Sequence, residues 1–194
     1  MTGSDIALLV AVLVALIALA LYLTMTAGRL DRLHKRIDTA ALTVDAHALR
    51  RSSVAQELAM SGLLDPASAL LVAQAAHNAR AGSEYAVTSA ERAALETDLT
   101  RALEAALSEE DVREVRSDDA GAALLTELQG ACLRLGLSRR FLNDAVRACR
   151  QVRRQRMARW FHLSGHTGWP LTSDWDDSIP TGLMAATGGA TEVR

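Results

Sequence analysis

IALLVAVLVALIALALYLTM, residues 6–25, is an uninterrupted run of twenty residues without a charged side chain. A helix of that length, rising 1.5 Å per residue, spans about 30 Å, the thickness of the hydrocarbon core of a bilayer. A cleaved signal peptide would carry a basic segment before a shorter apolar run, whereas only Asp5 and the amino terminus precede this one. The run therefore predicts a membrane anchor within residues 1–28, with the lipid bilayer as the partner of residues 6–25.

The charges that flank the anchor predict its orientation. No Lys or Arg precedes the run, whereas Arg29, Arg32, Lys35 and Arg36 follow it closely. Flanks rich in Lys and Arg stay on the cytoplasmic side of a membrane. We therefore expect a single-pass protein of the cell membrane, with its N-terminus outside and the rest of the chain in the cytoplasm.

The composition of the whole chain favours helices over strands. Ala and Leu are its commonest residues, aromatic residues make up 4% and prolines number 3. The net charge of −2 excludes a wholly basic nucleic-acid coat. Cys132 and Cys149 lie 17 residues apart on one predicted helix, too far along its axis for a disulfide, which fits a reducing compartment.

Apolar residues at helical spacing predict four amphipathic helices after the anchor. The first continues from the anchor to about Gly62, with Arg50 and Arg51 expected off its apolar stripe. Asp65-Pro66 predicts the start of the second helix, and Thr88 with Glu91 predicts a capping box for the third. Residues 108–119 are expected to form a charged loop, and the fourth helix to run from about Asp118 to about His162.

These elements predict an all-α protein in which the N-terminal transmembrane helix continues into an antiparallel up-down helical bundle. The domains are the anchor (1–28), the bundle (29–162) and a mostly disordered polar tail (163–194) rich in Gly, Pro, Ser and Thr. The tail holds two tryptophans, Trp169 and Trp175, among acidic residues. It is a candidate for recognising a partner, and it could equally fold back onto the bundle.

Two segments resemble the LemA family of bacterial membrane-anchored proteins. Residues 36–51 are similar to the family segment that follows the anchor, and residues 140–146, RFLNDAV, are similar to its R-x-F-Y-N-D-A-V segment. Leu142 departs from the motif tyrosine, and Ala41 replaces an aromatic residue. The resemblance covers roughly residues 6–160 and implies a membrane-tethered helical bundle with no established catalytic activity. The matched positions are Arg36, Asp38, Asp45, Arg140, Phe141, Asn143 and Asp144.

Several roles are open for these matched positions. They could be polar groups on helix surfaces, with an Arg140–Asp144 pair at i,i+4. They could also meet in a network between the first and last helices that fixes their register, or form a ligand site.

An arginine-rich stretch without acidic residues lies near the end of the predicted last helix and is followed by two aromatic residues. In an up-down bundle this end returns toward the membrane, where Arg side chains attract anionic lipid headgroups and Trp and Phe settle at headgroup level. The alternatives are a solvated helix face and, less favoured, nucleic acid, for which neither a stacking platform nor a recognition-helix pattern is present. The candidate membrane-surface or partner-binding residues are Arg147, Arg150, Arg153, Arg154, Arg156, Arg159, Trp160 and Phe161.

The sequence contains no pattern of catalytic residues. His162 and His166 could share a helical face, but they stand where glycines break the helix and have no cysteine nearby, so we expect no metal site and no cofactor. The predicted function is a non-catalytic, membrane-tethered scaffold or adaptor that recruits a protein partner or lipid at the cytoplasmic leaflet, with self-association also plausible. The alternative is a regulatory subunit of a membrane enzyme or transporter, which it would contact through the small residues of the anchor.

Overall fold

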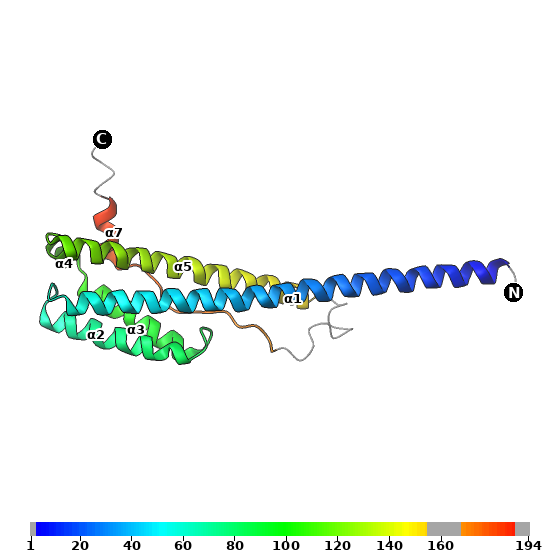
Figure 1. The fold of residues 1–194 in the computed structure, drawn as a ribbon, viewed down its shortest axis with the longest axis horizontal. Coiled ribbons are helices and arrows are strands. Elements are labelled where there is room, and N and C mark those ends of the chain that lie inside the picture. The colour runs from blue at the N-terminus through cyan, green and yellow to red at the C-terminus, as the bar shows by residue number, and fades with distance from the viewer. Residues whose placement is uncertain (1–2, 155–167, 189–194) are drawn as a thin grey trace, which may run out of the picture. The chain divides into compact units, whose positions relative to one another are not determined.

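The computed structural model describes residues 3–154 and 168–188, and in these ranges it contains helices and no strands (Figure 1). The all-α prediction is therefore confirmed. The elements are α1 (Gly3–Met60), α2 (Pro66–Ala81), the short 3-10 helix η1 (Gly82–Glu84), α3 (Ala90–Ala106), α4 (Glu109–Val115), α5 (Asp119–Arg153) and α7 (Thr181–Gly188).

The chain divides into two compact units, and both long helices contribute to each of them. The anchor unit comprises Met1–Asp38 and Asp144–Pro170, and the bundle unit comprises Thr39–Asn143 and Leu171–Arg194.

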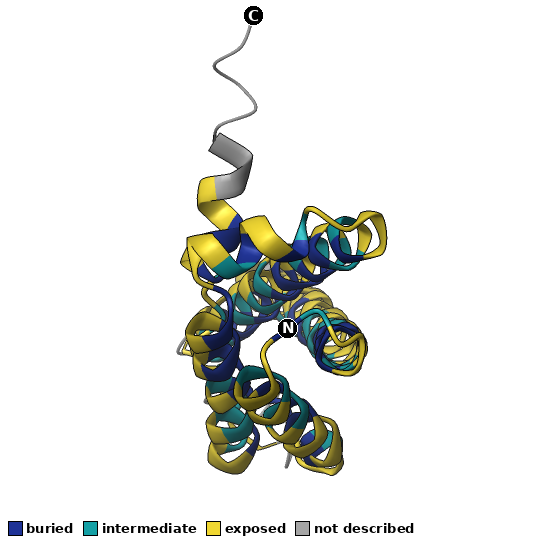
Figure 2. Cartoon of the chain, turned by 90° about the vertical axis from the view of Figure 1, so that its left-hand side faces the viewer, coloured by how far each residue is buried: buried dark blue, intermediate teal, exposed yellow. Residues whose placement is uncertain are grey.

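In the bundle unit, α1, α2, α3 and α5 run alternately in opposite directions (Figure 1). Their inward faces carry the buried residues (Figure 2). Leu58, Leu99 and Leu128, from three different helices, are completely buried in one apolar core. The antiparallel bundle arises because each helix has a single apolar face to bury.

The connection between α1 and α2 follows the predicted signals. Gly62 has a φ of +77°, a conformation that glycine adopts at little cost, and it follows the last turn of α1. The Asp65 carboxylate accepts hydrogen bonds from the main-chain N–H groups of Ala67 and Ser68 at 2.9 and 3.2 Å. These bonds satisfy free donors at the start of α2. Hydrogen bonding by Ser68, first from its side chain and then from its main-chain N–H, lowers the pKa of Asp65.

Two local predictions were wrong. Ser89, rather than Thr88, caps α3, because its hydroxyl accepts from the main-chain N–H of Arg92 at 3.1 Å. The expected loop at 108–119 contains α4, which begins with a reciprocal capping box between Ser108 and Asp111. This helix forms because Val112 is 2% exposed and packs in the apolar core, so the segment does have a face to bury.

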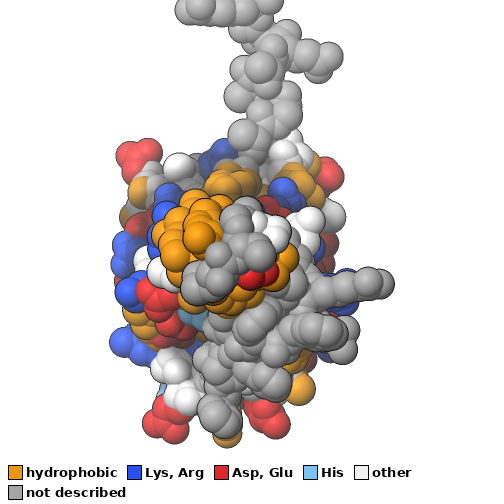
Figure 3. Space-filling model, turned by 90° about the vertical axis from the view of Figure 1, so that its right-hand side faces the viewer, with side chains coloured by type: hydrophobic (Ala, Val, Ile, Leu, Met, Phe, Trp, Pro, Cys, Tyr) orange, Lys and Arg blue, Asp and Glu red, His pale blue; other side chains and the backbone are white. Residues whose placement is uncertain are grey.

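The anchor unit contains the apolar first part of α1, which is long and apolar enough to cross a membrane. None of its most apolar window is buried, and Leu8 is 69% exposed. Figure 3 shows hydrophobic side chains gathered on this part of α1. By contrast, Leu30, Val146 and Cys149 are buried in the same unit, so the apolar surface of α1 is covered only beyond the stretch of bilayer length.

The region assigned to a mostly disordered tail is structured where it is described. Residues 171–188, here called the strap, pack on the bundle unit and end in α7. Trp175 is 6% exposed and Leu183 is completely buried, the latter within the apolar core. The expectation of disorder is wrong for this segment, because some of its few apolar residues are buried against the helices of the bundle.

Both cysteine thiols are buried, and burial raises the pKa of Cys132 and of Cys149. A thiol reacts as its thiolate, so both changes lower reactivity. We expect iodoacetamide at pH 8 to modify the folded chain at least about tenfold more slowly than the chain in guanidinium, as followed by mass spectrometry. Equal rates in the two conditions would contradict this burial.

Candidate functional site

The strap lies as an extended chain on the bundle unit, and side chains of α5 hold its main chain. The Asn143 amide makes two hydrogen bonds with Ser173. Its Nδ2 donates to the Ser173 carbonyl oxygen at 2.9 Å, and its Oδ1 accepts from the Ser173 main-chain N–H at 2.9 Å. One side chain thus satisfies both main-chain groups of a strap residue, as a neighbouring β-strand would.

Side chains of α3 hold the strap in a similar way three residues further on. Thr97 Oγ1 accepts from the Asp176 main-chain N–H at 3.2 Å, and Thr100 Oγ1 donates to the Asp176 carbonyl oxygen at 2.7 Å. The strap is therefore gripped through its main chain by two helices. We call the surface formed by Thr97, Thr100, Glu104, Arg139 and Asn143 the strap groove.

Charged and aromatic side chains fix the position of the strap in this groove. Arg139 donates from Nε and Nη2 to the two carboxylate oxygens of Asp177, at 2.8 and 2.6 Å. Such a two-point contact is stronger and more directional than a single charged bond. Glu104 accepts from the main-chain N–H and the hydroxyl of Thr181, at 2.9 and 2.6 Å, at the start of α7. Trp175, which lies between Ser173 and Asp177 in the sequence, is buried.

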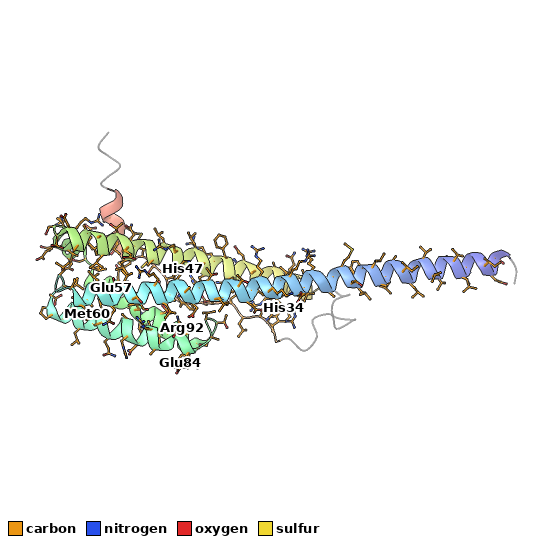
Figure 4. All side chains as sticks on the ribbon, in the orientation of Figure 1. His34, His47, Glu57, Met60, Glu84 and Arg92 are labelled. Atoms are coloured by element: carbon orange, nitrogen blue, oxygen red, sulfur yellow. The ribbon has the colours of Figure 1, made fainter. Side chains whose placement is uncertain are left out.

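A buried charge network lies next to the strap groove. Arg51, Arg92 and Glu96 are each completely buried (Figure 4 labels Arg92). Arg51 Nη2 donates to Glu96 Oε2 at 2.6 Å, and Arg92 Nε lies 3.0 Å from Glu96 Oε1, within ion-pair distance though not aligned as a hydrogen bond. Arg92 Nη2 also donates to Asp45 of α1 at 3.1 Å. The network therefore contains two guanidinium groups and two carboxylates, one of each on α1 and one of each on α3, and their formal charges cancel.

The network and the groove share Thr100. Its hydroxyl oxygen accepts from Arg51 Nη1 at 3.0 Å while the hydroxyl donates to the strap at Asp176. The Asp176 carboxylate accepts from the main-chain N–H of Ser178 at 3.0 Å, which lowers the pKa of that carboxyl. Thr100 therefore connects the buried network to the main chain of the strap through two hydrogen bonds.

The described part of the arginine stretch lies in the anchor unit. Arg150 Nε donates to the Pro170 carbonyl oxygen at 2.8 Å, and Arg153 Nη1 donates to the Gly168 carbonyl oxygen at 2.6 Å. The Arg153 guanidinium also lies over the Trp169 ring, 5.2 Å from its centroid. Arg147 pairs with Asp144, and Arg154 is exposed. The other candidates, Arg156, Arg159, Trp160 and Phe161, and the histidines 162 and 166, lie outside the described residues.

The matched family positions serve different purposes. Asp45 joins the buried network, but through α3 rather than through the last helix. Asn143 holds the strap, whereas Asp144 pairs with Arg147 rather than with Arg140, the partner considered among the open roles. Arg36, Asp38, Arg140 and Phe141 are exposed. In residues 3–154 and 168–188, no group of three or more His, Cys, Asp or Glu is placed to hold a metal ion.

Sequence reasoning missed the network and the strap groove. Arg51 was expected off the apolar stripe, which is wrong, since it is completely buried.

Comparison of the chain with protein-family models, with curated proteins and with solved structures finds no match.

Proposed function

We propose that this chain is a single-pass, membrane-tethered helical scaffold that presents its bundle and strap to a partner at the cytoplasmic surface. The observation that carries this proposal is the continuity of α1. One helix of 58 residues contains both an exposed apolar stretch of bilayer length and, further along, residues of the bundle core. An exposed apolar surface of that size is costly in water and is stabilised in lipid.

The expected result for membrane attachment is retention in the membrane pellet after a carbonate wash. Replacing Leu13 and Val14 by Arg should release most of the protein, because a charge at the centre of a bilayer costs about 2.5–3.5 kcal/mol on the insertion scale. Leu42, which is 72% exposed in the bundle unit, supplies the matched control, since Leu42→Arg should leave the protein in the pellet. Unchanged retention of the double-Arg variant would contradict the anchor, and a reporter fused after Arg194 tests the orientation.

Basic residues support a second contact, with anionic lipid headgroups. The described residues of the anchor unit carry eight Lys and Arg against four Asp. The bonds of Arg150 and Arg153 to carbonyl oxygens leave their formal charges in place, and Arg147 and Arg154 are exposed. Charges of this kind near an anionic leaflet are worth about 1 kcal/mol each.

Liposome flotation of the chain from residue 29 onward tests this lipid contact. Binding to anionic vesicles should exceed binding to neutral vesicles, and replacing Arg147 and Arg154 by Ala should weaken it by roughly tenfold or more, as about 1 kcal/mol per residue implies. The matched control is the pair Arg113 and Arg140, both exposed in the bundle unit. Equal binding to neutral and anionic vesicles would overturn the lipid contact while leaving the anchor untouched.

A further inference from the structure

We propose that the strap groove is a binding site for an extended peptide segment of a partner protein, and that the strap is its intramolecular occupant. This inference rests on the proposed scaffold function and names the surface and the chemistry by which the scaffold would hold its partner.

The groove grips main-chain groups, which every extended peptide offers. Asn143 pairs with the N–H and C=O of Ser173, and Thr97 and Thr100 pair with those of Asp176. Recognition of this kind resembles the addition of a β-strand, in which main-chain hydrogen bonds provide affinity and side-chain positions provide specificity.

Side-chain contacts restrict which residues the bound segment can carry at three positions, numbered here from Ser173. The first position, occupied by Ser173, is completely buried and therefore takes a small residue. The third position holds the buried aromatic ring of Trp175. The fifth position holds the Asp177 carboxylate, which accepts two hydrogen bonds from the Arg139 guanidinium. Opposite this carboxylate the helix has Gly136, where a Cβ would lie 3.2 Å from Asp177 Oδ2. The expected ligand is thus an extended segment of the form small-x-aromatic-x-Asp.

The strap does not satisfy every polar atom that it buries, which favours a displaceable occupant. Ser173 Oγ and Trp175 Nε1 are buried and have no hydrogen-bond partner among the described residues. A buried polar atom without a partner disfavours the bound state. A partner segment with Ala at the first position would avoid one of these losses and would bind more tightly than the strap itself.

The experiment uses the full chain in anionic nanodiscs and a fluorescent peptide of residues 171–184, with anisotropy as the readout. The strap is weakened within the chain by Trp175→Ala together with Asp177→Asn, which leaves the groove residues unchanged. We expect this variant to bind the peptide at least about tenfold more tightly than the unmodified chain does. A peptide carrying Ser173→Ala should bind more tightly again. Adding Asn143→Ala to the strap-weakened chain should reduce binding at least about tenfold, and a peptide with Trp175→Ala and Asp177→Asn should not bind.

Circular dichroism of each variant separates a lost fold from a lost groove. A strap-weakened chain that keeps its helix content but gains no affinity for the peptide overturns the proposal. Light scattering adds a second criterion. If the unmodified chain is a dimer that the peptide dissociates, the occupant in trans is a second copy of the chain, and the proposal of a separate partner is overturned. Insertion into the nanodisc is measured independently, so failure of the groove and failure of the membrane-tethered scaffold are distinguishable.

Discussion

Replacing Glu96 by Ala is expected to lower the free energy of unfolding by about 3–5 kcal/mol, because it leaves two buried guanidinium groups without their shared carboxylate. Arg51 and Arg92 are both completely buried, and Glu96 is the acid that contacts both of them. A loss of this size is a large part of the stability of a typical domain. Urea unfolding followed by circular dichroism measures it.

Asp98→Ala is the matched control for this prediction, on the same helix. Asp98 is exposed and its ion pair with Arg101, at 3.5 Å, is also exposed. An exposed pair contributes about 0–1 kcal/mol, so this variant should unfold close to the unmodified chain. A Glu96→Ala variant as stable as the Asp98→Ala variant would show that the buried charges are compensated in another way.

Replacing the charged core as a set distinguishes its contribution to stability from the cost of breaking it. A variant with Met at Arg51 and Arg92 and Leu at Glu96 removes all three buried charges together. Buried ion pairs replaced by apolar residues of similar volume often give equal or greater stability. We therefore expect the triple variant to be far more stable than Glu96→Ala.

The buried network was detectable in the sequence, but hydrophobicity alone concealed it. Arg51 stands three residues after Ala48 and four before Ala55, which places it on the apolar stripe of α1 rather than beside it. Arg92 and Glu96 occupy the same kind of positions before Leu99 on α3. An Arg on the apolar stripe of α1 and a Glu on the apolar stripe of α3 predict a buried ion pair between the two helices, because a buried charge needs a partner. The network considered from the sequence joined the first and last helices, and it did not include Arg51, Arg92 or Glu96.

The course of the main helices could be predicted because it depends on local signals. The Asp65-Pro66 start, the glycine near residue 62 and the three- and four-residue spacing of apolar side chains act over a few positions. The strap could not be predicted in this way. It docks through its main chain onto Thr97, Thr100 and Asn143, and such bonds impose no periodicity on the docked segment. A composition rich in Ser, Thr and Asp therefore looks the same whether the segment is docked or free.

Replacing Gly182 by Ala is expected to release the strap. A Cβ at this position would lie 2.3 Å from the Leu107 carbonyl oxygen and 2.7 Å from that of Ser108. Because these are main-chain atoms, no side chain can move aside, and overpacking of this kind costs about 1–3 kcal/mol. Hydrogen exchange measured by mass spectrometry should show faster exchange over residues 171–188. Gly168→Ala is the control, since apart from its chain neighbours no described residue has an atom within 4 Å of a Cβ built there.

Release by Gly182→Ala also provides an independent test of the groove. This change lies in α7 and alters none of the residues Thr97, Thr100, Arg139 and Asn143 that hold the strap further upstream. A released strap leaves these groups free to bind an added peptide. Gly182→Ala should therefore raise the affinity for the 171–184 peptide, as is expected of the changes at Trp175 and Asp177. If exchange becomes faster while affinity for the peptide stays unchanged, then the groove closes or collapses when the strap leaves, and the strap is a structural element of the bundle rather than a ligand. If exchange itself is unchanged, the contact of Gly182 with the end of α3 does not hold the strap in place.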